Sequence, residues 1–342
     1  MRITKIFLFF LCFHQLAVAQ NHTPVLSDLS GEELRNKLVE DFKPATVLNS
    51  SGAKDFLYGY VENRNDSVRC VYSGHTLYLP PNVDPSVAMY MNNSPDGINL
   101  EHTYPRSKGA GGGNAVSDLH HLFPTRIPVN ESRGNFPFGE IADNQTTNWF
   151  LGNQTQSNPP NTNIDAYSEQ INGKFEPRED HKGNVARAMF YFYTMYESEA
   201  LAADANFFES QREILCEWHN LDPVDQAEWE RTYRVAESQS NLPNPFILDC
   251  SLANRTYCPN TPCSISTNTM EEEVTAINIY PNPVTDVVRI EADGDLQIQV
   301  FDSIGKLFYE NTALNTTVID FSSFPKNVYF ISVNNQVYKV VK

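Results

Sequence analysis

The sequence pattern changes abruptly near residue 260, and this change constrains the fold more than any other feature. Residues 20 to about 265 mix helix-like and strand-like segments, whereas residues 276–342 are short runs of alternating apolar and polar residues separated by turn pairs. The polar, patternless run NTPCSISTNTMEEE lies between them and indicates a linker at residues 266–275. Because 342 residues exceed the usual length of one domain, we expect an α+β unit at 20–265 followed by a small all-β sandwich at 276–342.

The first unit contains several strong helix signals. Residues 29–41 are predicted to form a helix in which Ser30 is the N-cap and Glu33 completes a capping box. Residues 68–79 have a strand pattern, and residues 180–200 form the strongest helix. That helix carries an apolar stripe that should face a core, made of Val185, Met189, Phe192 and Tyr196. Two further helices are predicted at residues 209–219 and 224–238.

Residues 1–19 have the three-part pattern of a cleaved export signal. Arg2 and Lys5 form a basic start, an apolar run covers residues 6–13, and Ala17-Val18-Ala19 is a small-x-small cleavage site. A membrane anchor is the alternative, but the apolar run is too short to span a bilayer. Removal of two basic residues from a chain of net charge −17 gives −17 − 2 = −19, which should repel nucleic acid at long range.

The cysteines agree with an exported protein, because export permits disulfides. Five of the six remain after Cys12 leaves with the signal. Cys250, Cys258 and Cys263 are close enough in sequence to predict one local disulfide, and the odd count leaves at least one thiol free or paired elsewhere. No CxxC pair is present, which argues against a structural zinc site made of thiolates.

The C-terminal unit resembles the C-terminal sorting domain of proteins exported by the type IX secretion system. The resemblance rests on three motifs in this order: Tyr280-Pro281-Asn282-Pro283, the turn at residues 302–306 (DSIGK), and the terminal residues 337–342 (VYKVVK). It implies the type IX secretion machinery as a partner and a secreted or cell-surface location. The alternative is an ordinary accessory β-domain that binds a surface.

Residues 100–126 concentrate side chains that can carry out chemistry. Glu101 can bind a divalent metal through oxygen, and His102 can act as a general base near neutral pH. Neighbouring residues in a regular strand point to opposite faces, so both can serve one site only if the strand ends or is distorted there. Pro105, three residues later, makes an ending plausible.

A pair of histidines follows in the run SDLHHLF. Ser117 or Asp118 can cap a short helix, on which His120 and His121 would point about 100° apart. One of them can then face a site while the other faces away. The intervening GAGGGN is predicted to be a flexible connection, since it lacks the Lys-Ser/Thr of a phosphate-binding loop. The zinc-protease motif HExxH is absent from the sequence.

These residues and the segments that follow them resemble the endonuclease I family of secreted nucleases, which are of the His-Me finger (ββα-metal) type. The resemblance covers roughly residues 30–250 and is carried by motifs in the family's order: EHTYP at 101–105, DLHHLFP at 118–124, Val129-Asn130, RGN at 133–135, KGNVARA at 182–188, LCEWH at 215–219 and NPFI at 244–247. It implies a ββα-metal nuclease domain surrounded by helices.

The resemblance also assigns roles to individual residues. It implies that His102 is the general base, that Glu101 is a metal ligand and that His121 is the second protein ligand, which leaves His120 a supporting role. Three further residues are expected either to position phosphate or to brace the site, and these two roles stay open: Arg133, Asn135 and Arg106.

The function expected from these residues is phosphodiester hydrolysis of DNA, RNA or both, with little sequence specificity. One divalent metal ion, magnesium by its preference for oxygen and water ligands, would be the cofactor, and a nitrogen ligand at His121 would also admit manganese or another softer metal. One alternative is a non-catalytic surface-binding protein that retains a nuclease fold. Another is a zinc hydrolase that uses all three histidines, which the angle between His120 and His121 disfavours.

Overall fold

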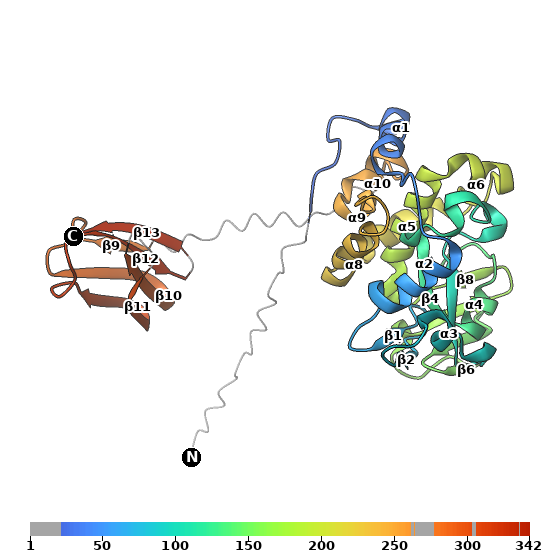
Figure 1. Ribbon diagram of the computed structural model, residues 1–342, viewed down its shortest axis with the longest axis horizontal. Helices are drawn as coiled ribbons and strands as arrows, with labels where there is room; N and C mark the ends of the chain where they lie inside the picture. The colour runs from blue at the N-terminus through green and yellow to red at the C-terminus, as the bar shows by residue number, and fades with distance from the viewer. Residues whose placement is uncertain (1–21, 261–262, 264–276, 303–305, 335) are drawn as a thin grey trace, which may run out of the picture. The chain divides into compact units, whose positions relative to one another are not determined.

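The computed structural model describes residues 22–260, 263, 277–302, 306–334 and 336–342 (Figure 1). The predicted export signal lies outside the described residues, as does the predicted linker. The chain divides into two compact units at residues 1–265 and 266–342. Each unit has its own apolar core.

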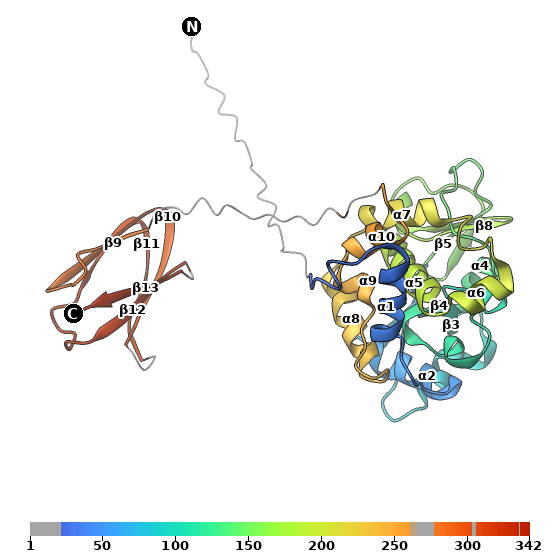
Figure 2. The same cartoon turned by 90° about the horizontal axis from the view of Figure 1, so that it is seen from above.

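Helix α5 (Lys182–Met195) forms the centre of the first unit (Figures 1 and 2). Every residue of α5 except Asn184 is buried, as expected for a helix enclosed by other elements on all sides. The predicted helix at 180–200 is therefore confirmed in position, but it breaks at Tyr196 and continues as α6 (Glu197–Asp204). The predicted apolar stripe is buried, and so are the polar residues Lys182, Arg187 and Thr194 on the other faces of the helix.

Several helices surround α5. They are α1 (Gly31–Phe42), α7 (Arg212–Leu221), α8 (Gln226–Ala236), α9 (Pro245–Leu248) and α10 (Ser251–Thr256), with α2 (Ser50–Phe56), a π-helical turn η1 (Leu57–Val61) and α3 (Pro85–Tyr90) nearer the strands. The predicted capping box of α1 is wrong. Ser30 is the N-cap, but its side chain makes no capping hydrogen bond, because Gly31 adopts a φ of +62° and turns the first amides away.

The strands of the first unit form three small antiparallel sheets. β1 (Ser67–Arg69) pairs with β2 (Thr76–Tyr78), which confirms the strands predicted at 68–79. β5 (Asn148–Leu151), β6 (Gln154–Gln156), β7 (Ser168–Ile171) and β8 (Lys174–Glu176) form a sheet in the order β6-β5-β7-β8.

The third sheet positions the residues singled out from the sequence. β3 (Ile98–His102) pairs with β4 (Leu122–Arg126), which places Glu101 opposite Phe123 and His102 opposite Leu122. Three short 3-10 turns connect the two strands: η3 (Arg106–Lys108), η4 (Gly113–Val116) and η5 (Leu119–His121). Helix α4 (Ile127–Arg133) follows β4 directly, so the segment has the order strand, strand, helix.

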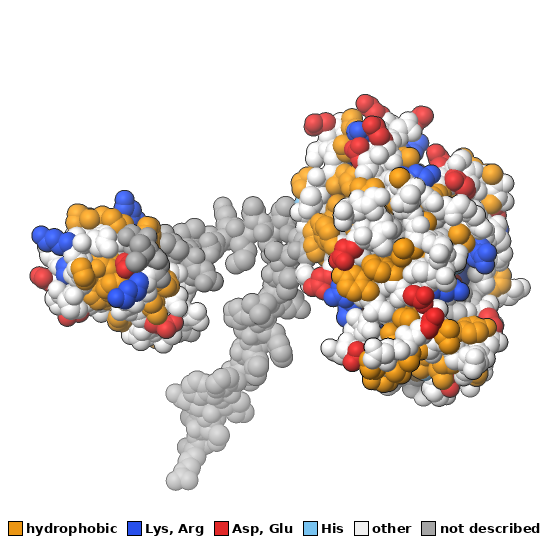
Figure 3. Space-filling model, in the orientation of Figure 1, with side chains coloured by type: hydrophobic (Ala, Val, Ile, Leu, Met, Phe, Trp, Pro, Cys, Tyr) orange, Lys and Arg blue, Asp and Glu red, His pale blue; other side chains and the backbone are white. Residues whose placement is uncertain are grey.

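Two disulfides close the C-terminal part of the first unit. Cys250 pairs with Cys263, which confirms the predicted local bridge, and Cys216 pairs with Cys258. The remaining thiol, Cys70, is free and buried. On the face drawn in Figure 3, acidic side chains gather over α1, in keeping with the acidic sequence.

The second unit is all β, as predicted. Its strands are β9 (Asn278–Tyr280), β10 (Val287–Asp302), β11 (Leu307–Asp320), β12 (Val328–Val333) and β13 (Gln336–Val341). β10 pairs with β11 along most of its length, with β9 through residues 289–291 and with β12 through residues 298–302. The sheet therefore folds over on itself, and alternate residues such as Val288, Ile290 and Ile298 fill the interior.

None of the helices among the described residues has the length and apolar character required to cross a membrane.

Candidate active site

A cavity of about 400 Å³ opens at the end of β3 and brings several of the predicted residues together. Glu101, His102, Arg106 and Asn135 line it, and Asn130 from α4 joins them. A second cavity of about 560 Å³ lies beside it and shares His102 and Arg106 with the first. His102 therefore stands where the two cavities meet.

The strand ends where the sequence requires it to end. β3 ends at His102. Side chains alternate between the two faces of a regular strand, and at the last residue of β3 this alternation no longer has to direct His102 away from Glu101. Glu101 extends toward Tyr72 and Arg133, and His102 extends toward the backbone of Val116. Both side chains line the same cavity.

The imidazole of His102 is held in one tautomer. Its Nε2 lies 3.0 Å from the carbonyl oxygen of Val116, and since a carbonyl only accepts, Nε2 carries the proton. Nδ1 then has a lone pair, and it has no partner among the described residues. Burial, assisted by His121, lowers the pKa of His102 to about 3. The ring is therefore neutral at physiological pH, the form that a general base needs.

Glu101 is 2% exposed, yet one of its oxygens has no side-chain donor among the described residues. Oε1 forms an ion pair with Nε of Arg133 at 2.7 Å and accepts a hydrogen bond from the hydroxyl of Tyr72 at 3.1 Å. No side chain of the described residues donates to Oε2. Burial raises the pKa of Glu101 to about 7, and the positive charge of Arg133 opposes this rise.

Asn130 presents a second oxygen to the same cavity. Its Nδ2 donates to Oδ1 of Asn99 at 2.7 Å and to the carbonyl of Leu100 at 3.1 Å. These bonds fix the amide, and its oxygen Oδ1 accepts none from the described residues. In the sequence, Val129-Asn130 is visible only as part of the resemblance to the endonuclease I family. The signal for a role was its place in the helix that directly follows β4.

His121 lies next to His102 but does not line either cavity. It is fully buried at the end of η5, where Asp118 caps the turn by accepting from the backbone N–H of His120. Its Nε2 donates to the carbonyl of Ala115 at 2.7 Å, and the ring centroids of His121 and His102 are 5.7 Å apart. The metal-ligand role inferred for His121 stays a prediction, and Asn130 is the better placed residue.

His120 points away from the cavity, as its predicted supporting role requires. Its Nε2 donates to the carbonyl of Leu242 at 2.8 Å, and its ring lies against Tyr191. Among the described residues, no group of three His, Cys, Asp or Glu side chains could hold a metal ion. A site built from all three histidines is therefore not formed there.

Three residues were expected either to position phosphate or to brace the site, and their surroundings differ sharply. Arg133 is fully buried and donates to the carbonyls of Thr103 at 2.7 Å and Phe136 at 2.9 Å, which is the position of a brace. Asn135 lines the cavity and donates to the hydroxyl of Ser107. Arg106 is exposed, lines both cavities and has no hydrogen bond or ion pair among the described residues.

The glycine-rich connection is more than a flexible tether. Gly109 has a φ of +131°, and a Cβ there would lie 2.9 Å from the backbone of Ala200 in α6, so only glycine fits. The carbonyls of Ala115 and Val116, at the end of the same stretch, hold His121 and His102. Gly109 at the start of the connection thus packs against α6, whereas an added Cβ at Gly112 or Gly113 would meet nothing within 4 Å, and the predicted flexibility of the run stays a prediction.

Comparison with known proteins adds a family to this geometry. Residues 30–250 match the family model described as Endonuclease I, and residues 278–342 match the model of a secretion system C-terminal sorting domain. An extracellular ribonuclease of Bacillus subtilis (strain 168) is 32% identical over 161 residues, which are 44% of this chain and 50% of the relative. An extracellular ribonuclease of Bacillus amyloliquefaciens is 31% identical over 161 residues, which are likewise 44% of this chain and 50% of the relative. The chain thus spans about half the length of the curated relatives it matches.

Proposed function

The chain belongs to the endonuclease I family of nucleases and is secreted or displayed at the cell surface, and on that premise we propose that it is a metal-dependent phosphodiester hydrolase of DNA, RNA or both. The observation that carries the proposal is the neutral His102, whose Nδ1 has no partner among the described residues and which lines one cavity with Glu101 and Asn130, whose Oε2 and Oδ1 have no side-chain donor.

In the proposed reaction, His102 removes a proton from the attacking water through Nδ1. The bond from Nε2 to the carbonyl of Val116 keeps the ring in this orientation. The same carbonyl stabilises the imidazolium that forms, because its oxygen carries a partial negative charge.

The residues of the cavity fit a hard divalent cation. Glu101 Oε2 and Asn130 Oδ1 are oxygen donors, and two protein ligands leave the other positions to water and phosphate, as magnesium prefers. When bound, such an ion would neutralise charge on the phosphate and on the leaving oxygen. The positive charge of Arg133 opposes the effect of burial on the pKa of Glu101 and so favours the ionised carboxylate that a metal ion needs.

Substrate contacts are expected on both sides of His102. Arg106, exposed and unpaired among the described residues, can bind a backbone phosphate from either cavity. Lys54 and Tyr90 line the second cavity and supply a further charge and an exposed ring on which a base can stack. The names of the two ribonuclease relatives make RNA one candidate substrate. Contacts of this kind recognise the phosphate backbone and the flat face of any base, so they give little sequence specificity.

Cleavage of plasmid DNA and total RNA by the chain lacking residues 1–19 tests the proposal. We expect magnesium-dependent cleavage that stops in EDTA and falls by about 10²–10⁴-fold in His102→Ala, as for loss of a general base. The matched control His22→Ala, at the N-terminal edge of the unit, should retain activity. If both nucleic acids stay intact with magnesium, manganese, nickel and zinc alike, the chain is not a nuclease and the non-catalytic alternative stands.

Calorimetric titration with magnesium distinguishes the candidate ligands. Glu101→Ala and Asn130→Ala should each lose most of the metal affinity, whereas Glu131→Gln, which removes a neighbouring carboxylate from the same cavity, should not. His121→Ala is expected to keep magnesium affinity while it lowers stability. Loss of binding in His121→Ala with full binding in Asn130→Ala would restore His121 as the second ligand.

A further inference from the structure

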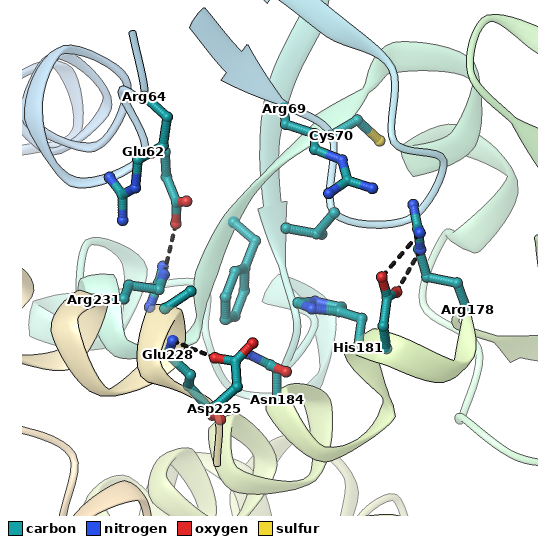
Figure 4. A pocket seen from close by; sticks show the side chains of 14 residues that line it. Glu62, Arg64, Arg69, Cys70, Arg178, His181, Asn184, Asp225, Glu228 and Arg231 are labelled. Carbon is teal, nitrogen blue, oxygen red and sulfur yellow. Dashed lines mark hydrogen bonds and ion pairs between the residues drawn. The ribbon is translucent and has the colours of Figure 1, made fainter. Parts of the chain in front are cut away.

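A third cavity, of about 240 Å³, lies apart from the candidate active site and shares no lining residue with its two cavities. Four arginines from separate parts of the chain line it, and we call it the arginine pocket (Figure 4): Arg64, Arg69, Arg178 and Arg231. Four acidic residues line the same cavity: Glu62, Asp180, Asp225 and Glu228. Glu62 forms an ion pair with Arg231, Asp180 with Arg178, and Glu228 with Arg187, so Arg64 and Arg69 are the lining arginines without a carboxylate partner among the described residues.

Two of these arginines, Arg69 and Arg178, come close to each other beside Gly74. A Cβ added to Gly74 would lie 2.7 Å from Nη1 of Arg178 and 3.2 Å from Nη2 of Arg69, and only a glycine at this φ of +71° leaves room for both. Arg178 is paired with the exposed Asp180, whereas Arg69 has no hydrogen bond or ion pair among the described residues. Like charges this close repel each other, and an anion between them would relieve the repulsion.

A buried histidine adds an unused donor. His181 is 6% exposed, and its Nε2 has no hydrogen-bond partner among the described residues. Figure 4 shows the ring between Arg178 and the interior of the pocket. Burial, reinforced by the surrounding arginines, lowers the pKa of His181 to about 3, so the ring is neutral and one nitrogen can donate. A buried donor without an acceptor is costly and calls for a ligand.

The size and the arrangement of donors select the ligand. The volume of about 240 Å³ is below the roughly 300–1,000 Å³ of pockets that hold drug-sized molecules. Arg69 comes from β1, whereas Arg178 and His181 come from the 3-10 turn η7 (Glu179–His181) and its N-cap, so donors from two elements meet in the pocket. This arrangement suits a tetrahedral group better than a planar carboxylate that one arginine binds bidentately. We propose that the arginine pocket binds a phosphate group at a position separate from the catalytic cavity. This inference rests on the proposed function, and the phosphate group would belong to a nucleic acid or to a cleavage product.

Calorimetric titration of the full exported chain with inorganic phosphate, in EDTA, tests this directly. We expect saturable binding that weakens roughly tenfold in Arg69→Gln, the loss of one charge-assisted contact. Arg234→Gln is the matched control, because it removes a half-buried arginine of α8 that does not line the pocket. Gly74→Ala should also weaken binding with no change of charge, provided that circular dichroism shows the fold intact. No saturable binding, or equal affinity in Arg69→Gln and Arg234→Gln, overturns the proposal.

The same variants identify the source of the phosphate when titrated with a short DNA oligonucleotide that has or lacks a 5′-phosphate. Weaker binding of both forms by Arg69→Gln assigns an internal phosphate, and weaker binding of the phosphorylated form alone assigns a chain end. An effect on inorganic phosphate only assigns a free product. Each of these supports the site. None of these titrations requires cleavage of nucleic acid. The binding test of the arginine pocket therefore gives its result whether or not the chain is a nuclease.

Discussion

Replacement of Arg133 by methionine should reveal how the candidate site is held together. The change removes the ion pair to Glu101 and the donors to the carbonyls of Thr103 and Phe136, all in a fully buried position. Breaking a buried pair by removing one partner costs about 3–5 kcal/mol. Burial already raises the pKa of Glu101 to about 7, so without Arg133 this carboxyl takes up a proton. We therefore expect a loss at the lower end, about 3 kcal/mol.

The double variant Arg133→Met/Glu101→Gln separates the pair from the rest of the brace. Because glutamine is neutral without taking up a proton, the double variant should be more stable than Arg133→Met by about 1–2 kcal/mol, a coupling typical of residues in contact. The control Arg106→Gln removes an exposed arginine of the same cavity and should change stability by less than about 0.5 kcal/mol, while it raises KM for nucleic acid. Magnesium affinity should fall in Arg133→Met, because a protonated Glu101 is a poor ligand.

Urea unfolding followed by tryptophan fluorescence measures these differences in the full chain. All three tryptophans, Trp149, Trp218 and Trp229, belong to the first unit, so the signal reports on that unit alone. An unchanged midpoint in Arg133→Met would refute the brace. A double variant no more stable than Arg133→Met would show that the ion pair with Glu101 is not what the arginine contributes.

Three further predictions concern stability. Burial raises the pKa of Glu169 from 4.5 to about 7, so the folded state holds a proton that the unfolded state releases between these values, and stability falls as pH rises through them. Glu169→Gln should remove this loss, with a gain of about 1–2 kcal/mol near pH 8 and little near pH 4 in urea unfolding. Gly183→Ala should cost about 3 kcal/mol in thermal unfolding, since its Cβ would overlap the carbonyl of Asp222, and an unchanged melting temperature would contradict the close approach. Replacing Cys216 and Cys258 together by serine opens a crosslink with a sequence separation of 42 and should cost about 3–4 kcal/mol in thermal unfolding, and reduction of the wild type, which opens Cys250–Cys263 as well, should cost at least as much.

Local patterns predicted the elements of the fold better than their ends. The helix at 180–200 was visible from its apolar residues, but Tyr196, which ends α5, is as apolar as the residues before it. The capping box at Ser30 had the right residue types, and it failed because the backbone of Gly31 decides where the cap points. A φ angle of this kind depends on tertiary packing, which a pattern of residue types does not contain.

The site shows the same limit. Glu101 and His102 were found because adjacent acid and base in one strand are visible in sequence, and the end of β3 brings them together as expected. His121 and Asn130 could not be ranked, because their difference lies in burial: one ring is sealed behind His102, and one amide faces the cavity. The arginine pocket was not anticipated, since Arg69 and Arg178 meet only in the folded chain.

The first unit joins its own beginning to its end. The backbone N–H of Thr23 donates to the carbonyl of Leu248, that of Val25 donates to Asp249, and Arg255 binds three carbonyls of residues 25–29. These contacts make a seam at which the two ends of the unit could be spliced by a short peptide and new ends cut in an exposed loop. Such a circular permutant should retain the candidate site intact, because none of the cavity residues lies at the seam.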